Sequence, residues 1–202
     1  RTPSSIFYLN SLFYLPIIKY YFFQIGAILI MGFSCNYFIY LIKKGLKVKN
    51  YDKFFFLSLL FFLFTIIFFY RIAEHGTDRS AQILIFLLII ELLFIINFEK
   101  GIRENIVKIS IILGLVISLK SFYILYLALI LPVLYYFLID KKFNNILLIF
   151  KNYFFYFFLL LFSNVLFVNF ANSGCLIYPV SITCFDYFSW SIPLQEVSAL
   201  ND

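Results

Sequence analysis

Long uninterrupted runs of apolar residues, separated by short polar stretches, dominate this sequence of 202 residues. The runs do not alternate apolar and polar positions, so they argue against the strands of a membrane β-barrel and for transmembrane helices. About 20 helical residues are needed to cross the hydrocarbon core of a bilayer. The pattern predicts about six spans, at residues 21–42, 54–70, 80–97, 106–119, 122–139 and 153–169. We therefore expect an all-α fold, a polytopic transmembrane helical bundle.

The fourth and fifth predicted spans are nearly continuous along the chain. Residues 106–139 form one run of 34 residues, which would be roughly 50 Å long as a single helix. This length is too great for one crossing of the bilayer. A charge interrupts the run within Ser118-Leu119-Lys120-Ser121. We therefore expect a tight helical hairpin that turns at one membrane surface.

The two ends of the chain differ from the predicted bundle of residues 21–169. Residues 1–20 are aromatic and weakly amphipathic; Ser4 or Ser5 can cap a helix there, and Pro16 ends or kinks it. They predict an interfacial helix in the headgroup layer, with the end of another span as the alternative. Residues 170–202 predict the start of a short outward-facing segment. Because the chain starts at Arg1 and stops within this segment, we interpret it as a fragment of a larger protein.

Composition excludes several classes of protein. Hydrophobic residues make up 64% of the chain and charged residues 13%, so a soluble domain of this size could not cover its apolar surface. The same composition excludes a disordered chain and leaves no solvated domain long enough to bind nucleic acid. One His and three scattered Cys exclude a His-rich or zinc site within this chain.

Lysine and arginine residues gather on one predicted side of the membrane. Eleven lie in the stretches 43–53, 100–108 and 141–151, whereas five lie on the opposite side. Cytoplasmic loops carry the excess of positive charge in membrane proteins. The richer side is therefore predicted to be cytoplasmic, and both ends of the chain are predicted to face outward.

The densest ionisable stretch of the sequence lies in an outward loop, at residues 71–82. Glu74 and Asp78 are carboxylates of the kind that bind Mg²⁺ or Mn²⁺, and together they form a candidate metal site. Arg71 and Arg79 carry forked donors that suit a phosphate. The alternative is an exposed loop with local ion pairs, in which Thr77 or Asp78 caps the following helix.

Three further ionisable residues are candidates for function. His75, the single His, is either a catalytic base or a hydrogen-bonding loop residue. Lys120, in the predicted hairpin, either contacts a lipid phosphate or snorkels, with its stem in the apolar region and its ammonium group at the membrane interface. Glu91 lies inside the third predicted span, where a carboxylate is costly and is a candidate for function by default. The sequence does not name a partner for Glu91.

The outward C-terminal segment contains two cysteines, Cys175 and Cys184. An outward segment lies in an oxidising compartment, so we expect a disulfide between them, with the turn made at Pro179. Cys35 lies within the first predicted span and is expected to be a free thiol.

The order of these features resembles the C-type glycosyltransferase superfamily (GT-C), integral membrane enzymes that use polyprenyl-phosphate-linked sugars. In detail, Arg79-Ser-Ala-Gln-Ile-Leu, Gly114-Leu-Val-Ile-Ser-Leu-Lys120 and Ser173-Gly-Cys-Leu-Ile-Tyr-Pro179 look like bacterial inner-membrane proteins related to it. In a bacterial inner membrane, the outward ends predicted from the charge count would face the periplasm. The resemblance implies that Glu74 and Asp78, by their position, orient the donor phosphate, a metal ion or the acceptor. The first acidic loop of that superfamily would lie upstream of Arg1.

The resemblance implies a glycosyltransferase of cell-envelope glycan assembly, with a polyprenyl-phosphate-linked sugar as donor and a glycan or lipid as acceptor. In this interpretation Asp78, Glu74 and His75 are the catalytic candidates, and Arg71, Arg79 and Lys120 bind the donor phosphate. A divalent cation, Mg²⁺ or Mn²⁺, is a candidate cofactor. The alternatives are a polysaccharide polymerase or ligase, a transporter or flippase, and a membrane scaffold without catalysis.

Overall fold

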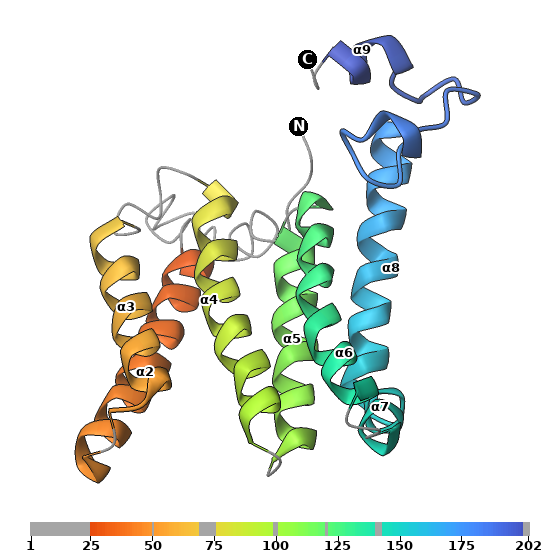
Figure 1. Cartoon of the computed structure of the whole chain (residues 1–202). Helices are drawn as coiled ribbons and strands as arrows, with labels where there is room; N and C mark the ends of the chain where they lie inside the picture. The colour runs from red at the N-terminus through yellow and green to blue at the C-terminus, as the bar shows by residue number, and fades with distance from the viewer. Residues whose placement is uncertain are drawn as a thin grey trace.

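The structure is a computed structural model that describes residues 25–49, 51–68, 76–98, 101–119, 121–139 and 143–199. Within these ranges it is mostly helical, and it contains no β-strand (Figure 1). The predicted all-α fold is confirmed. The predicted interfacial helix of residues 1–20 lies outside the described residues.

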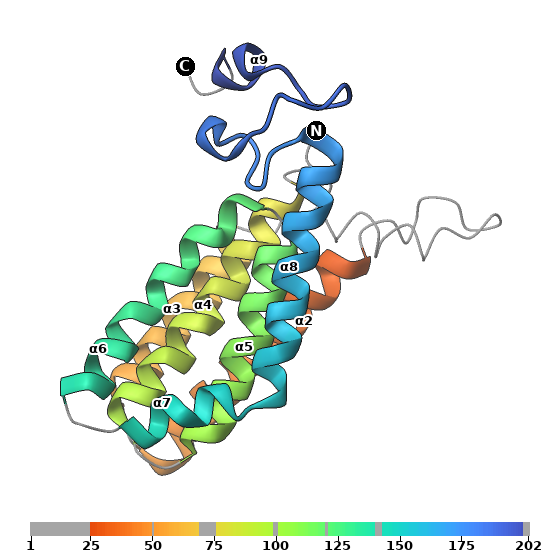
Figure 2. The same cartoon turned by 90° about the vertical axis from the view of Figure 1, so that its right-hand side faces the viewer.

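The elements follow one another along the chain with short connections. In chain order they are α2 (Ile25–Val48), α3 (Lys53–Phe68), α4 (Gly76–Asn97), α5 (Ile102–Leu119), the 3₁₀ helix η2 (Ser121–Ile130), α6 (Leu131–Ile139), α7 (Phe143–Phe150), α8 (Tyr153–Ser173), η3 (Ser181–Thr183) and α9 (Leu194–Ala199). The long elements lie side by side and alternate in direction (Figures 1 and 2).

The connections fall at two ends of the bundle. Residues 43–49, 51–53, 101–108 and 143–151 lie at one end, which we call the lysine-rich end (Figure 1). The first turn of α4, the end of α5 and residues 174–199 lie at the other end, which we call the Asp78 end (Figure 1). The separation of the lysine-rich connections from Asp78 therefore follows from the alternation of the helices.

Four helices are long and apolar enough to cross a membrane: Ile25–Val48, Asp78–Asn97, Phe122–Ile139 and Tyr153–Ser173. Helix α3 is apolar but shorter. Helix α5 has 18 residues, and Arg103, Glu104 and Lys108 occupy its first two turns. These helices indicate an integral membrane protein.

Several helices are longer than their predicted spans, because polar residues extend them beyond the apolar run. Helix α2 continues from residue 42 to Val48 through three lysines, which are favourable helix residues with long apolar stems. Helix α5 starts at Ile102 instead of residue 106, and α8 continues from residue 169 to Ser173. Helix α4 is already formed at Gly76, so Asp78 lies in its first turn and not before the helix.

The predicted fifth span is not one uniform α-helix. It starts as the 3₁₀ helix η2 and changes to the α-helix α6 at Leu131. Pro132 has no backbone N–H, so it cannot donate the bond that an α-helix running through this position requires. The change in helix type next to Pro132 is consistent with this restriction. The predicted break between the fourth and fifth spans is correct, since α5 ends at Leu119 and η2 starts at Ser121.

Helix α7 was not predicted, because its run of eight residues is too short to cross a membrane. It lies at the lysine-rich end, between α6 and α8 (Figure 2). None of its residues is fully buried.

Each outer helix buries one face and exposes another apolar face. Helix α3 buries Phe54, Ser58, Phe61 and Thr65, which recur at the spacing of one helix stripe. The opposite stripe remains exposed and includes Phe56 (58%) and Ile67 (57%). Exposed apolar faces of this extent are stable against lipid chains and costly in water.

The segment after α8 folds back on the end of that helix. Cys175 and Cys184 form an antiparallel bridge and are joined by a disulfide with an S–S distance of 2.00 Å, as the sequence predicts. The backbone N–H of Phe185 donates to the carbonyl of Gly174 at 2.9 Å. Trp190 packs edge-on against Phe170 of α8, with ring centroids 5.6 Å apart. The disulfide and the hydrogen bond therefore close the segment on itself, and the aromatic contact packs it against α8.

Gly174 ends α8 in a left-handed conformation, with φ of 77°. A Cβ atom there would lie 2.5 Å from Ser191 Cβ and 2.9 Å from the carbonyl oxygen of Phe185. We expect Gly174→Ala to destabilise this segment by about 2–4 kcal/mol, through backbone strain and overpacking. Faster reduction of the disulfide by dithiothreitol would measure the effect. Gly32→Ala is the control, because a Cβ at Gly32 meets no atom within 4 Å. Equal reduction rates in the two variants would contradict the prediction.

Candidate functional site

Of the six predicted catalytic and phosphate-binding residues, two are described, and both lie at the start of α4. Asp78 and Arg79 are half-buried in its first two turns. The predicted catalytic residues Glu74 and His75, and the predicted phosphate ligands Arg71 and Lys120, lie outside the described residues. Whether Glu74 and Asp78 share a metal ion therefore stays a prediction. Among the described residues, no three His, Cys, Asp or Glu side chains are grouped as metal ligands.

A tyrosine of the next hairpin binds the Asp78 carboxylate. Tyr123 of η2 donates its O–H to Asp78 Oδ1 at 2.7 Å. Tyr123 is 7% exposed, so its ring is packed in the core and its hydroxyl position is fixed. A hydrogen bond to a charged group contributes about 1.5–3 kcal/mol. The pair therefore joins α4 to η2 and orients one oxygen of the carboxylate.

A recess lies directly below this pair, one helical turn further into the bundle. It has a volume of about 300 Å³ and is lined by Phe64 of α3, Tyr126 of η2, and Gln82, Ile85 and Phe86 of α4. Gln82 follows Asp78 by one turn of α4, and Tyr126 follows Tyr123 by one turn of η2. We call the carboxylate at the helix end and the mostly apolar recess one turn away together the Asp78 site.

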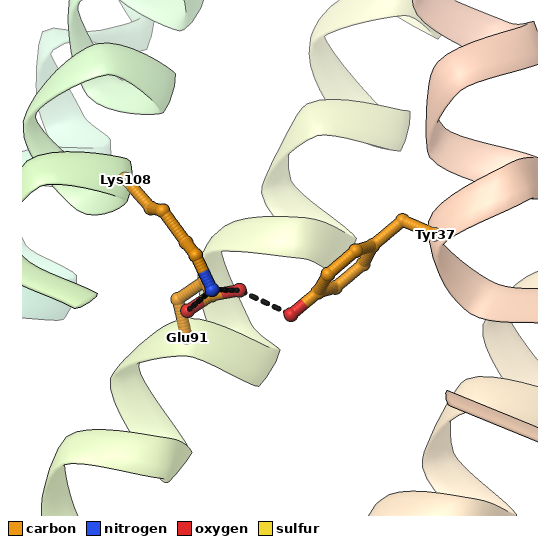
Figure 3. Close-up of polar contacts among 3 residues, drawn as sticks. All are labelled: Tyr37, Glu91 and Lys108. Atoms are coloured by element: carbon orange, nitrogen blue, oxygen red, sulfur yellow. Dashed lines mark hydrogen bonds and ion pairs between the residues drawn. The ribbon is translucent and has the colours of Figure 1, made fainter. Parts of the chain in front are cut away.

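A second polar cluster is buried nearer the lysine-rich end. Glu91 of α4 is 1% exposed, and both of its carboxylate oxygens lie 3.3 Å from Lys108 Nζ of α5 (Figure 3). Tyr37 of α2 donates its hydroxyl to Glu91 Oε1 (Figure 3). The ammonium group of Lys108 also lies 5.8 Å from the centroid of the Tyr37 ring. Glu91, the intramembrane carboxylate without a predicted partner, therefore connects three helices.

The helix bounds in the structure explain why Glu91 meets Lys108. Asn97 ends α4 and Ile102 starts α5, so the two helices form an antiparallel hairpin. Glu91 lies six residues before the end of α4, and Lys108 lies six residues after the start of α5. Equal distances from the turn place the two side chains at the same depth. The sequence pattern instead counts Lys108 among the positive charges of the stretch 100–108. No comparable relation connects Tyr37 with Glu91, because α2 is separated from α4 by 54 residues at this contact.

Lys108 and Tyr37 also line a pocket of about 590 Å³ that extends to the lysine-rich end, which we call the lysine-end pocket. The last turns of α2, the start of α3, the end of α4 and the first turns of α5 surround it. Its charged lining residues are Lys44, Asp52, Glu104 and Lys108. The pocket is thus polar at one wall and aromatic at another, where Phe54 and Phe94 stack with ring centroids 4.3 Å apart.

A third recess, of about 570 Å³, is almost entirely apolar. It lies among α4, α5, η2, α6, α7 and α8, and its lining includes Leu92, Ile109, Phe137 and Phe155. These residues belong to the half of the bundle near the lysine-rich end, so this recess is separate from the Asp78 site.

Comparison of the sequence with known proteins gives one result. Searches of curated proteins and of solved structures found no match. A family model described as a domain of unknown function, DUF8201, matches residues 3–201, which is nearly the whole chain. The chain therefore belongs to the DUF8201 family.

Proposed function

We propose that this chain is part of an integral membrane glycosyltransferase that uses a polyprenyl-phosphate-linked sugar donor in cell-envelope glycan assembly. The observation that carries the proposal is the Asp78 site. It combines a fixed carboxylate at the end of a membrane helix with a mostly apolar recess one turn below it. A lipid-linked sugar needs both features, because its reacting group is polar and its anchor is a hydrocarbon chain.

The proposed reaction assigns a role to each side chain of the site. Asp78 accepts the proton of the acceptor hydroxyl, which then attacks the anomeric carbon of the donor sugar. Arg79, with Arg71 and Lys120, stabilises the negative charge that develops on the departing polyprenyl phosphate. Tyr123 is a positioning residue, because it acts through its hydrogen bond to Asp78. A divalent cation held by Asp78 and Glu74 would supply further stabilisation of the leaving phosphate.

The proposal includes an orientation in the bacterial inner membrane. The chain crosses the membrane six times, through α2, α3, α4, α5, the η2–α6 unit and α8. The lysine-rich end is cytoplasmic by the excess of positive charge, so the Asp78 site and the disulfide segment face the periplasm. A glycan or lipid acceptor of envelope assembly would be reached from that side.

Orientation is testable with single cysteines in a Cys35→Ser background that keeps the native disulfide. Asn144 of α7 is exposed at the lysine-rich end, and Tyr187 is 90% exposed after the disulfide. We expect a thiol reagent that cannot cross membranes to label Tyr187→Cys in intact cells. We expect Asn144→Cys to be labelled only after the inner membrane is opened. Labelling of both positions in intact cells would contradict the six-crossing orientation.

The enzymatic proposal is tested directly by donor turnover. Full-length protein reconstituted in liposomes is incubated with polyprenyl-phosphate sugars of several kinds, with and without Mg²⁺, and with extracted envelope glycans and lipids as acceptors. We expect release of polyprenyl phosphate together with a glycosylated acceptor. Absence of turnover with every donor and acceptor, in a protein that remains folded, would contradict the proposal.

A further inference from the structure

The lysine-end pocket contains charges of both signs at the boundary between the apolar helices and the lysine-rich connections. The apolar run of α2 ends at Ile42, and Lys44 follows within the same helix. Glu104 lies in the first turn of α5. Lipid headgroups lie at this boundary in a bilayer.

Two of the four charged lining residues already have partners. Lys108 is bound to the buried carboxylate of Glu91. Asp52 starts α3 by accepting the backbone N–H groups of Phe54 at 3.1 Å and Phe55 at 3.0 Å. Lys44 and Glu104 remain, one cation on α2 and one carboxylate on α5, both exposed. Neither side chain forms an ion pair or a hydrogen bond within the described part of the chain.

We propose that the lysine-end pocket binds the headgroup of a zwitterionic phospholipid that carries a primary ammonium group, such as phosphatidylethanolamine. The phosphate pairs with Lys44, and the ammonium group pairs with Glu104. The stacked rings of Phe54 and Phe94 form an apolar wall for the start of the acyl chains. This binding is independent of the proposed sugar transfer, since the pocket and the Asp78 site lie at opposite ends of the bundle.

The pairing predicts an order of preference among lipids. The ammonium of ethanolamine has three N–H donors for a carboxylate, whereas the choline headgroup has none. An anionic phosphatidylglycerol headgroup would satisfy Lys44 but would be repelled by Glu104 and would leave it unpaired. Inorganic phosphate has neither the ammonium group nor the acyl chains, so it should bind more weakly than phosphatidylethanolamine.

The test is lipid titration of the full-length protein in detergent, followed by native mass spectrometry. The probes are phosphatidylethanolamine, phosphatidylcholine and phosphatidylglycerol with identical acyl chains, and inorganic phosphate. We expect phosphatidylethanolamine to bind about fivefold to tenfold more tightly than phosphatidylcholine, which is the gain from a charge-assisted pair. Equal affinities for these two lipids, tighter binding of phosphatidylglycerol, or equal binding of inorganic phosphate would each overturn the proposal.

Two variants assign the contacts. Glu104→Gln is expected to lower the affinity for phosphatidylethanolamine to that for phosphatidylcholine, without weakening phosphatidylglycerol. Lys44→Gln is expected to weaken all three lipids. Lys151→Gln, an exposed lysine at the same end, and Glu196→Gln, an exposed carboxylate of α9, are the controls. Unchanged lipid selectivity in Glu104→Gln would overturn the assignment, and both site variants remain measurable because their side chains are exposed.

Discussion

Replacement of Asp78 by Asn is expected to lower the turnover of a polyprenyl-phosphate-linked sugar by about 10²–10⁴-fold, the contribution of a positioned general base. Asn has nearly the same size as Asp and can still accept the hydrogen bond from Tyr123. The change therefore removes the negative charge and the basicity of residue 78 but keeps the hydrogen bond that joins α4 to η2. Initial rates of donor turnover by the reconstituted full-length protein measure the effect.

Asp186→Asn is the matched control for this prediction, because Asp186 is an exposed carboxylate in the segment at the same end of the bundle. It should retain the full rate. Tyr123→Phe should lower the rate about tenfold, through the loss of one hydrogen bond to the carboxylate, at the lower end of the range of about 1.5–3 kcal/mol. Undiminished turnover in Asp78→Asn would remove this residue from the mechanism and leave the reaction to other groups.

Replacement of Lys108 by Ala is expected to destabilise the protein by about 3 kcal/mol, because it leaves the Glu91 carboxylate buried without a cation. This value is at the lower end for a broken buried pair, since the Lys108 side chain is 46% exposed and water can reach its position. The measurement is thermal unfolding of the purified protein in detergent, with the wild type under the same conditions.

A second change separates the charge effect from the loss of side-chain packing. Glu91→Gln, introduced together with Lys108→Ala, removes the unpaired charge while the amide oxygen can still accept the bond from Tyr37. We expect this double variant to recover most of the lost stability. Arg103→Ala removes an exposed cation from the first turn of the same helix and should change little. Equal unfolding of the Lys108 and Arg103 variants would show that the ion pair adds no stability.

Apolar patterning predicted where most helices lie but not how each one ends. The break between α5 and η2 was visible as the polar residues Ser118 and Lys120 within an apolar run. The extension of α2 to Val48 was not visible in the sequence. Hydropathy marks the edge of the apolar run, whereas the helix ends where its backbone hydrogen bonds end. Helix α7 was not predicted for a related reason: an apolar run of eight residues is too short to count as a membrane span.

The candidate site was predicted in part. Asp78 was identified by the density of charge around it, and the structure adds Tyr123, which comes from a different hairpin 45 residues later in the chain. The recess below this pair depends on Phe64, Gln82 and Tyr126, which come from three separate elements. No local sequence pattern predicts that these three residues line one recess, because each of them is compatible with an ordinary membrane helix.

By itself, the sequence determined the helical class, the membrane environment and the segregation of lysines to one end, since each follows from hydropathy and charge along the chain. It also indicated the pairing of Cys175 with Cys184. Only the tertiary structure decided that Glu91 meets Lys108 and Tyr37, and that Asp78 meets Tyr123 above a recess. Those contacts depend on which face each helix turns toward its neighbours. In a chain with apolar residues on every face, hydrophobic periodicity does not specify that rotation.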